Sequence, residues 1–179
     1  MKPRDLPDVI ETDRLTLRPQ QPADAAVFRQ LWTERDTRIP AHRQIDAEGR
    51  PAVEDIAEQI RAASGPRPMT LERKDTGDVI GYCGLVFGGN GPADEPEIGF
   101  ELLRSQHRQG YATEAGGAIV HSAAAAGYRR LWATVWEWNT ASRRVLDKLG
   151  FREHSRDHSR PQHGTNVLYV LDLSEEEQL

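Results

Sequence analysis

Apolar and polar residues alternate in several short stretches of the chain, a pattern typical of strands that bury one face. Leu15 and Leu17 show it near the start, and Ile98, Phe100 and Leu102 show it again with polar partners between them. Two apolar runs on either side of an Asp-Thr-Gly-Asp turn predict a hairpin. The pattern predicts strands at 13–18, 69–73, 79–87, 97–102, 131–136 and 167–173.

Four other stretches carry apolar residues three and four positions apart, which is typical of helices with one buried side. Pro22 suits the start of the first helix, and a Ser-Gly-Pro turn follows the second. The third helix is rich in alanine and stops at Gly127, and Asn139 is a favoured cap for the fourth. The predicted helices cover 22–32, 53–60, 110–126 and 139–149.

The remaining segments are rich in glycine, proline or charge and predict loops. Segment 37–50 reads as an irregular connection and segment 88–92, Gly-Gly-Asn-Gly-Pro, as a flexible loop. The polar tract 154–160 is interpreted as a solvated loop, with a place in a binding site as the alternative. Since no repeat or linker appears, we expect one α/β domain over 1–179, with a flexible start at 1–10 and an acidic tail at 174–179.

Composition narrows the classes of function. The 179 residues carry a net charge of -5 with the charges mixed along the chain, which argues against binding to nucleic acid or to a membrane surface. The single cysteine, Cys83, permits no internal disulfide and is expected in the core. No histidine spacing suggests a metal site. The chain shows neither a signal sequence nor an apolar run of about 20 residues, so we expect a cytoplasmic protein.

The turn between the strand at 97–102 and the alanine-rich helix is a candidate anion site. Backbone N–H groups and the helix dipole at such a junction attract phosphate. Gly110 and Ala112 leave room for these N–H groups to approach a ligand. The Gly-Lys-Ser/Thr ending of a nucleotide-binding P-loop is absent. Taken alone, the segment fits an ordinary strand-to-helix connection equally well.

This turn resembles the acetyl-CoA loop of the GNAT superfamily, whose pattern Gln/Arg-x-x-Gly-x-Gly/Ala is matched here by His107-x-x-Gly110-x-Ala112. His107 replaces the usual Gln or Arg, and Arg108 stands where many relatives have another glycine. Further segments resemble the RimJ/RimL-like branch of N-acetyltransferases. They are 11–18, 97–100 and 139–142 continuing to 148–151.

The resemblance implies a twisted, mostly antiparallel mixed sheet of about seven strands, splayed at its centre and flanked by about four helices. Acetyl-CoA would lie in the gap, with no metal required. Its contacts would be Leu102, Leu103, His107, Arg108, Gln109, Gly110, Tyr111, Ala112, Thr113, Asn139 and Ser142.

The resemblance also implies catalytic roles. Glu97 would be the base that deprotonates the amine, and Glu101, on the same strand face, would share that role or bind the substrate's ammonium group. Ser142 matches a serine that serves the departing thiolate in the RimJ/RimL-like branch, which implies the same role here. Leu146 stands where many members place a tyrosine acid. The alternatives are solvated strand carboxylates for the two glutamates and helix capping for Asn139 and Ser142.

The expected reaction moves an acetyl group from acetyl-CoA to a primary amine by direct attack in a ternary complex. The amine would belong to a peptide N-terminus, an amino sugar or a polyamine, and loops 37–50 and 88–94 would face it. Trp132, Trp136 and Trp138 are expected in the core and the pocket wall. The protein would be a monomer or a homodimer. A non-catalytic acyl-CoA-binding or regulatory module, and a nucleotide-binding protein of another fold, stay open as alternatives.

Overall fold

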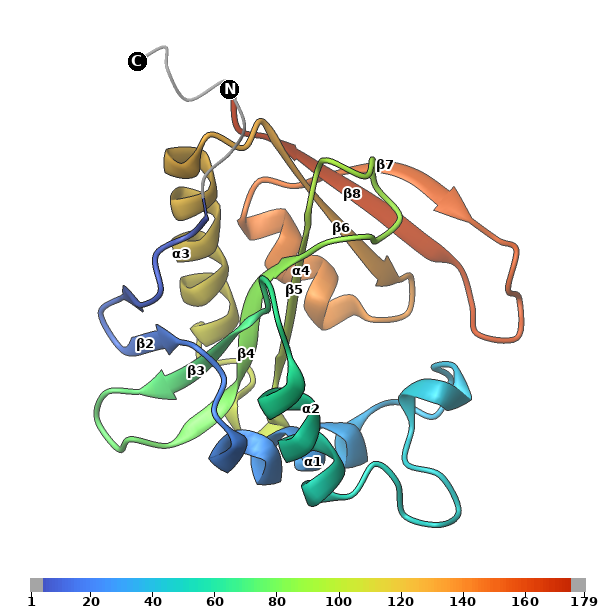
Figure 1. The fold of residues 1–179 in the computed structure, drawn as a ribbon. Helices are drawn as coiled ribbons and strands as arrows, with labels where there is room; N and C mark the ends of the chain where they lie inside the picture. Colours follow the sequence, from blue (N-terminus) through green and yellow to red (C-terminus); the bar gives the residue numbers. More distant parts are fainter. Residues whose placement is uncertain (1–4, 175–179) are drawn as a thin grey trace.

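One mixed sheet runs through the computed structural model, which describes residues 5–174. Its strands lie in the order β1-β2-β3-β4-β5-β6-β8-β7, and only β5 and β6 pair in parallel (Figure 1). All six strands expected from the sequence are present, with β1 and β7 in addition. The bounds are β1 (Ile10–Glu11), β2 (Leu15–Arg18), β3 (Met69–Arg73), β4 (Val79–Val86), β5 (Glu97–Leu102), β6 (Arg130–Trp136), β7 (Arg152–Asp157) and β8 (Asn166–Asp172).

Helices cover both faces of the sheet. The four α-helices are α1 (Ala25–Glu34), α2 (Val53–Ala62), α3 (Tyr111–Ala126) and α4 (Thr140–Lys148). Ile98 and Leu102 of β5 share the main core with α3 residues such as Ile119. Phe28 and Ile56 form a second core between α1 and α2 on the opposite face. Strand alternation therefore turns the even-numbered residues of β5 toward α3 and its odd-numbered residues toward the α1 side.

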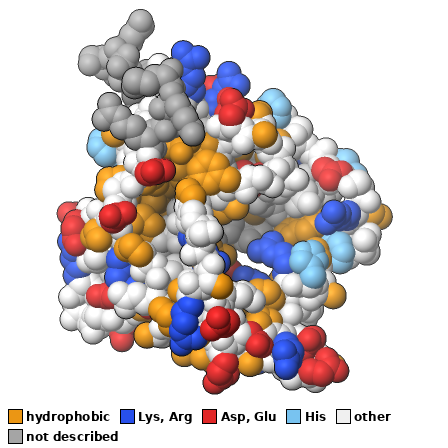
Figure 2. Space-filling model, viewed as in Figure 1, with side chains coloured by type: hydrophobic (Ala, Val, Ile, Leu, Met, Phe, Trp, Pro, Cys, Tyr) orange, Lys and Arg blue, Asp and Glu red, His pale blue; other side chains and the backbone are white. Residues whose placement is uncertain are grey.

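The sheet is splayed at its centre, as the resemblance implied. Strands β4 and β5 pair at six positions and β6 and β8 at seven, whereas β5 and β6 meet at one, Glu97 opposite Trp132. Beyond that pair the two strands part toward Leu102 and Trp136, their carboxyl ends. Figure 2 shows the molecular surface deeply hollowed near the centre of the same view. The turn after β5 and the connection from β6 to α4 both follow these diverging ends.

The edge strand β7 corrects the sequence-based prediction. The solvated loop expected over 154–160 is wrong for 154–157, which belong to β7 and pair with β8. All six residues of β7 are exposed, so neither strand face carries an apolar signal. Charged side chains on an edge strand also discourage pairing with other chains. His154 packs edge-on against Trp132, with ring centroids 5.0 Å apart.

The predicted ends of the chain are only partly described. Residues 5–9 form no helix or strand, and Ile10 begins β1; both Leu6 and Ile10 pack against the main core. Residues 1–4 and the predicted tail beyond 174 lie outside the described residues. Cys83 is fully buried, as predicted, and burial raises the pKa of its thiol to about 12. Among residues 5–174, no helix is long and apolar enough to cross a membrane.

Candidate coenzyme and active site

The turn after β5 combines two left-handed residues with a free helix start. Gly110 caps α3 with a φ of 83°, and Arg108 has a φ of 60°, a conformation uncommon for a residue with a side chain. The first intrahelical hydrogen bond runs from Glu114 N to Gly110 O at 3.0 Å. The N–H groups of Tyr111, Ala112 and Thr113 therefore have no partner within the helix and can receive an anion.

The end of β5 supplies one backbone donor to the gap. Leu103 N donates to Ile80 O of β4 at 2.9 Å, and Leu103 O accepts from Gln106 N at 2.9 Å. Because backbone groups alternate along an antiparallel strand, the N–H of Leu102 points away from β4 and toward β6. Within the described residues, Leu102 thus offers a free donor to the gap, whereas Leu103 keeps only the second lone pair of its carbonyl oxygen for the predicted contact.

His107 ties the turn to the strand that precedes it. Its Nε2 donates to the carbonyl oxygen of Leu102 at 2.9 Å. The ring therefore faces the backbone of β5 and fixes where the turn begins. His107, which replaces the Gln or Arg of the family pattern, therefore has a structural role in holding the turn against β5.

The start of α4 is capped by Asn139, whose Oδ1 accepts from the backbone N–H of Ser142 at 3.2 Å. The capping interpretation of Asn139 is thus confirmed for its oxygen. The hydroxyl of Ser142 and the Nδ2 of Asn139 have no hydrogen-bond partner within residues 5–174, so both stay available to a ligand. Leu146 is buried in the main core with an exposed fraction of 1%.

Glu97 is held by one of its two oxygens. Its Oε1 accepts from the backbone N–H of Asn90 at 2.5 Å and from the hydroxyl of Thr134 at 3.1 Å. The Asn90 side chain donates to Thr134 Oγ1 at 3.0 Å and so completes the triangle. Within the part of the chain described, Oε2 has no partner. Glu97 therefore keeps a free carboxylate oxygen where β5 and β6 part.

The glycine-rich loop lies closely over this carboxylate. A Cβ at Gly89 would stand 2.3 Å from Glu97 Oε1, and one at Gly91 would stand 2.8 Å from the Trp132 ring. The prediction of a flexible loop at 88–92 missed these contacts. The run of glycines is the signal that could have indicated them, since only a residue without a side chain permits such an approach.

Glu101 has very different partners. Both of its oxygens bind the Arg35 guanidinium at 2.8 Å, and Oε2 also accepts from the Tyr82 hydroxyl at 2.8 Å. Burial alone would raise the pKa of Glu101, but the hydrogen bonds and charge of Arg35, helped by Tyr82, lower it overall. Burial, together with the charge of Glu101, raises the pKa of Tyr82. Glu101 is therefore ionised and fully engaged.

Residues 14–152 match the family described as the acetyltransferase (GNAT) domain. The chain belongs to the GNAT acetyltransferase family. It is 30% identical to the uncharacterized N-acetyltransferase YoaA of Bacillus subtilis strain 168 over 149 residues, which cover 81% of this chain and 83% of YoaA. A putative GNAT-family acetyltransferase from Bordetella pertussis is similar in structure, with a TM-score of 0.69, 26% identity, and 92% and 99% of the two chains covered.

The GNAT fold also links this chain to Mycobacterium smegmatis RimJ in complex with CoA-disulfide. That structure has a TM-score of 0.74 and 24% identity, and covers 99% of this chain and 93% of RimJ. At this identity the likeness concerns the fold alone.

Three connections of this GNAT domain contact one another: α1 to α2, β6 to α4, and β7 to β8. The Arg38 guanidinium lies 4.1 Å over the Trp138 ring, and the carbonyl oxygen of Arg38 accepts from His163 Nδ1 at 2.9 Å. Trp138 in turn stacks on Trp136 with an interplanar angle of 3°. Trp132 is buried, with an exposed fraction of 6%. The core position expected for Trp132 is therefore confirmed, whereas the pocket-wall role of Trp136 and Trp138 stays a prediction.

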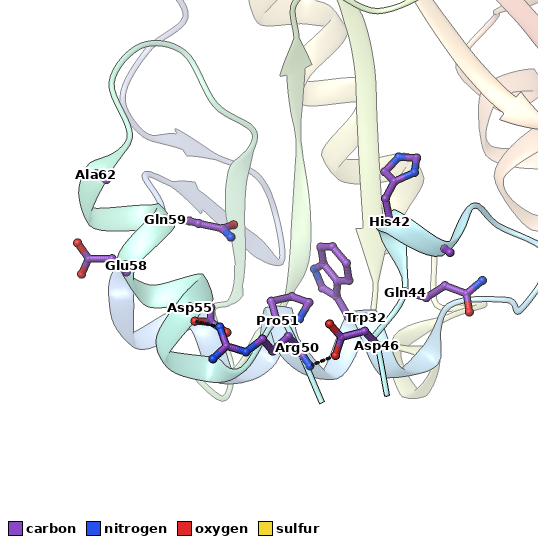
Figure 3. Close-up of a pocket in the computed structure, with 11 residues that line it drawn as sticks. Trp32, His42, Gln44, Asp46, Arg50, Pro51, Asp55, Glu58, Gln59 and Ala62 are labelled. Atoms are coloured by element: carbon purple, nitrogen blue, oxygen red, sulfur yellow. Dashed lines mark hydrogen bonds and ion pairs between the residues drawn. The ribbon is translucent and has the colours of Figure 1, made fainter. Parts of the chain in front are cut away.

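A pocket of about 670 Å³ lies beside the segment 37–50 that we expected to face the acceptor (Figure 3). Trp32 lines this pocket, and the Arg35 guanidinium that holds Glu101 lies 4.1 Å over its ring. Two of its carboxylates are used locally: Asp46 accepts from Arg50 N and Asp55 from Ala52 N, each at 2.8 Å. The lining residues are Trp32, Ala41, His42, Gln44, Asp46, Arg50, Pro51, Asp55, Glu58, Gln59 and Ala62.

Proposed function

We propose that this GNAT protein transfers the acetyl group of acetyl-CoA to a primary amine. The observation that carries the proposal is the grouping of three features around the gap in the sheet. The turn at 107–113 follows the end of β5, Ser142 lies just beyond the end of β6, and Glu97 marks the point where the strands part. This placement suits a coenzyme that enters between the strands with its pyrophosphate at the turn.

Pyrophosphate binding would fall to the backbone of the turn and the first turn of α3. The free N–H groups of Tyr111, Ala112 and Thr113 provide donors for two anionic groups, and the helix dipole adds a favourable potential. The free N–H of Leu102 would bind the pantetheine arm. Asn139 would bind the same arm through its Nδ2, because its oxygen caps α4.

The amine nitrogen would attack the thioester carbon, forming a C–N bond while the C–S bond breaks. The proton lost by the amine would pass to Glu97 Oε2, directly or through one water molecule. The electron pair of the broken bond would leave on sulfur, where the Ser142 hydroxyl donates a hydrogen bond and relays a proton from water to the thiolate. Glu101 would contribute by fixing Arg35 and Tyr82 beside the acceptor.

The acceptor belongs to the same proposal. We place the protein in the RimJ/RimL-like branch and propose a peptide N-terminus as the first amine to test, followed by polyamines and amino sugars. Purified protein would be incubated with acetyl-CoA and each amine while thiol release is followed. Turnover on at least one amine is the expected result. CoA binding without turnover on any amine would instead support the non-catalytic acyl-CoA-binding module.

A further inference from the structure

A short segment near the amino terminus reaches the proposed coenzyme turn. Arg14 donates from its backbone N–H to Glu114 Oε1 at 2.8 Å and from Nε to Glu114 Oε2 at 2.7 Å. Its Nη1 donates to Gln109 O at 2.8 Å. Its guanidinium also lies 4.4 Å over the Tyr111 ring. One side chain therefore contacts the turn on both sides of the Gly110 cap.

Gly110 and Arg14 fit each other closely. A Cβ at Gly110 would stand 3.3 Å from Arg14 Nη2. The guanidinium therefore lies on the side of the turn where a side chain at position 110 would project. The contact with the Gln109 carbonyl orients the peptide unit that leads into the cap. Because a carbonyl oxygen repels an anion, holding that oxygen on the Arg14 side favours a phosphate on the other side of the turn.

Arg14 also neutralises the charge of Glu114. This acid lies in the first turn of α3, where its charge would oppose a bound pyrophosphate. Burial alone would raise the pKa of Glu114, but hydrogen bonds from Thr12 and Arg14 lower it overall, so the carboxylate is ionised. Thr12 Oγ1 donates to Oε1 at 2.7 Å. Arg14 supplies the positive charge that offsets Glu114.

We propose that Arg14 is a positioning residue for the coenzyme: it orients the Gln109 peptide and offsets Glu114, so that the start of α3 presents an unopposed donor set to the pyrophosphate. The inference rests on the proposed function, which places the pyrophosphate there. It gives a role to the segment 11–18, whose relation to the coenzyme the sequence did not indicate. The side chain of Arg14 is 46% exposed, so its ion pair contributes little to stability.

The test compares three variants of the full chain. CoA would be titrated calorimetrically into wild type, Arg14→Ala, Arg14→Lys and Arg152→Ala, and thiol release would be measured on the best amine found. Arg152 is a matched control, since it is an exposed arginine paired with Asp172 at 2.6 Å on the far edge of the sheet. Melting temperature without ligand would report folding.

Arg14→Ala should raise the Kd for CoA and the KM for acetyl-CoA about tenfold, the scale of losing charge-assisted hydrogen bonds. Its kcat at saturating coenzyme should stay within about twofold of wild type. Arg14→Lys keeps the positive charge but loses the paired N–H donors of the guanidinium, and it should raise the Kd about threefold. Arg152→Ala should bind CoA as wild type does.

An unchanged Kd in Arg14→Ala, with or without a lower melting temperature, would overturn the inference. If that variant fails to fold, an unchanged Kd in Arg14→Lys would overturn it equally. Wild-type protein that binds no CoA would refute the proposed function and this inference together. Binding without turnover would refute catalysis alone, and the comparison of Kd values would still decide the role of Arg14.

Discussion

Glu97 and Glu101 lie four residues apart on one face of β5, yet their surroundings are opposite. Glu101 directs both oxygens to the Arg35 guanidinium and accepts a third hydrogen bond from Tyr82. Glu97 receives two neutral donors on one oxygen and leaves the other free within the described residues. Residue type and strand face are the same, so the elements that pack against each residue decide its chemistry.

The difference is the one expected between a structural carboxylate and a carboxylate that accepts a proton. A guanidinium bound through two hydrogen bonds cancels the charge of its carboxylate and makes it a poor proton acceptor. Neutral donors orient a carboxylate without cancelling its charge. We therefore assign the proposed base role to Glu97 and a supporting role to Glu101, and four substitutions test this division.

Glu97→Gln should have the largest effect. Loss of a general base should lower kcat about 10²- to 10³-fold. The amide keeps an oxygen for Asn90 and Thr134, so the melting temperature and the Kd for CoA should stay near wild type. Steady-state thiol release and calorimetry would measure both. A kcat within threefold of wild type would show that Glu97 is not the base.

Glu101→Gln should affect stability more than catalysis. It leaves the largely buried Arg35 unpaired, and we expect the free energy of unfolding at pH 7 to fall by about 3 kcal/mol. Since folding lowers the pKa of Glu101, its stabilisation is present above the ordinary glutamate value and is lost as pH falls through the lower folded value.

Urea denaturation at a series of pH values would therefore show the gap between wild type and Glu101→Gln narrowing toward acid. Glu97→Gln is the matched control, because it replaces the same residue type on the same strand without leaving a cation unpaired. Equal losses of stability in the two variants would remove the distinction between the glutamates.

Gly89→Ala tests whether the loop positions Glu97. The new Cβ would stand 2.3 Å from Oε1 and must displace either the carboxylate or the loop. We expect kcat to fall about 10- to 100-fold, the scale of a misplaced catalytic group. Gly117→Ala is a suitable control, since its Cβ would meet only Leu149, at 4.0 Å. Equal kcat values in the two variants would contradict the positioning role.

Ser142→Ala should have the smallest effect. Loss of one hydrogen bond to the thiolate should lower kcat about tenfold. The cap of α4 uses the backbone N–H of Ser142, so the substitution should not unfold the helix. Thiol release at saturating coenzyme would measure the change, and circular dichroism would follow the helix. An unchanged kcat would show that Ser142 has only a structural role, as the backbone donor to the Asn139 cap.

The regular elements were predictable because each of them buries one face. Apolar residues alternate in β5 and recur at helical spacing in α1 to α4 because one face of each element contacts a core. The strand β7 escaped prediction because all of its residues are exposed and its pairing with β8 leaves no apolar trace. The splay between β5 and β6 came from the resemblance, since local pattern carries no information on how two distant strands diverge.

The candidate site was also predictable only in part. The turn, Glu97 and Ser142 were each predicted from a short motif around the residue itself. The partners that distinguish the carboxylates are distant: Arg35 lies 66 residues from Glu101, and Thr134 lies 37 residues from Glu97. Arg14 lies 100 residues from Glu114. Such contacts depend on the register of the whole fold, which no single segment specifies.

A crystal structure of the protein with CoA would test the central claim most directly. We predict the pyrophosphate on the free backbone N–H groups of residues 111–113 and the pantetheine between β5 and β6. The sulfur should lie near the Ser142 hydroxyl, on the side of the free Glu97 oxygen. Coenzyme outside the gap, or a sulfur beside Glu101 and remote from Glu97, would contradict the account.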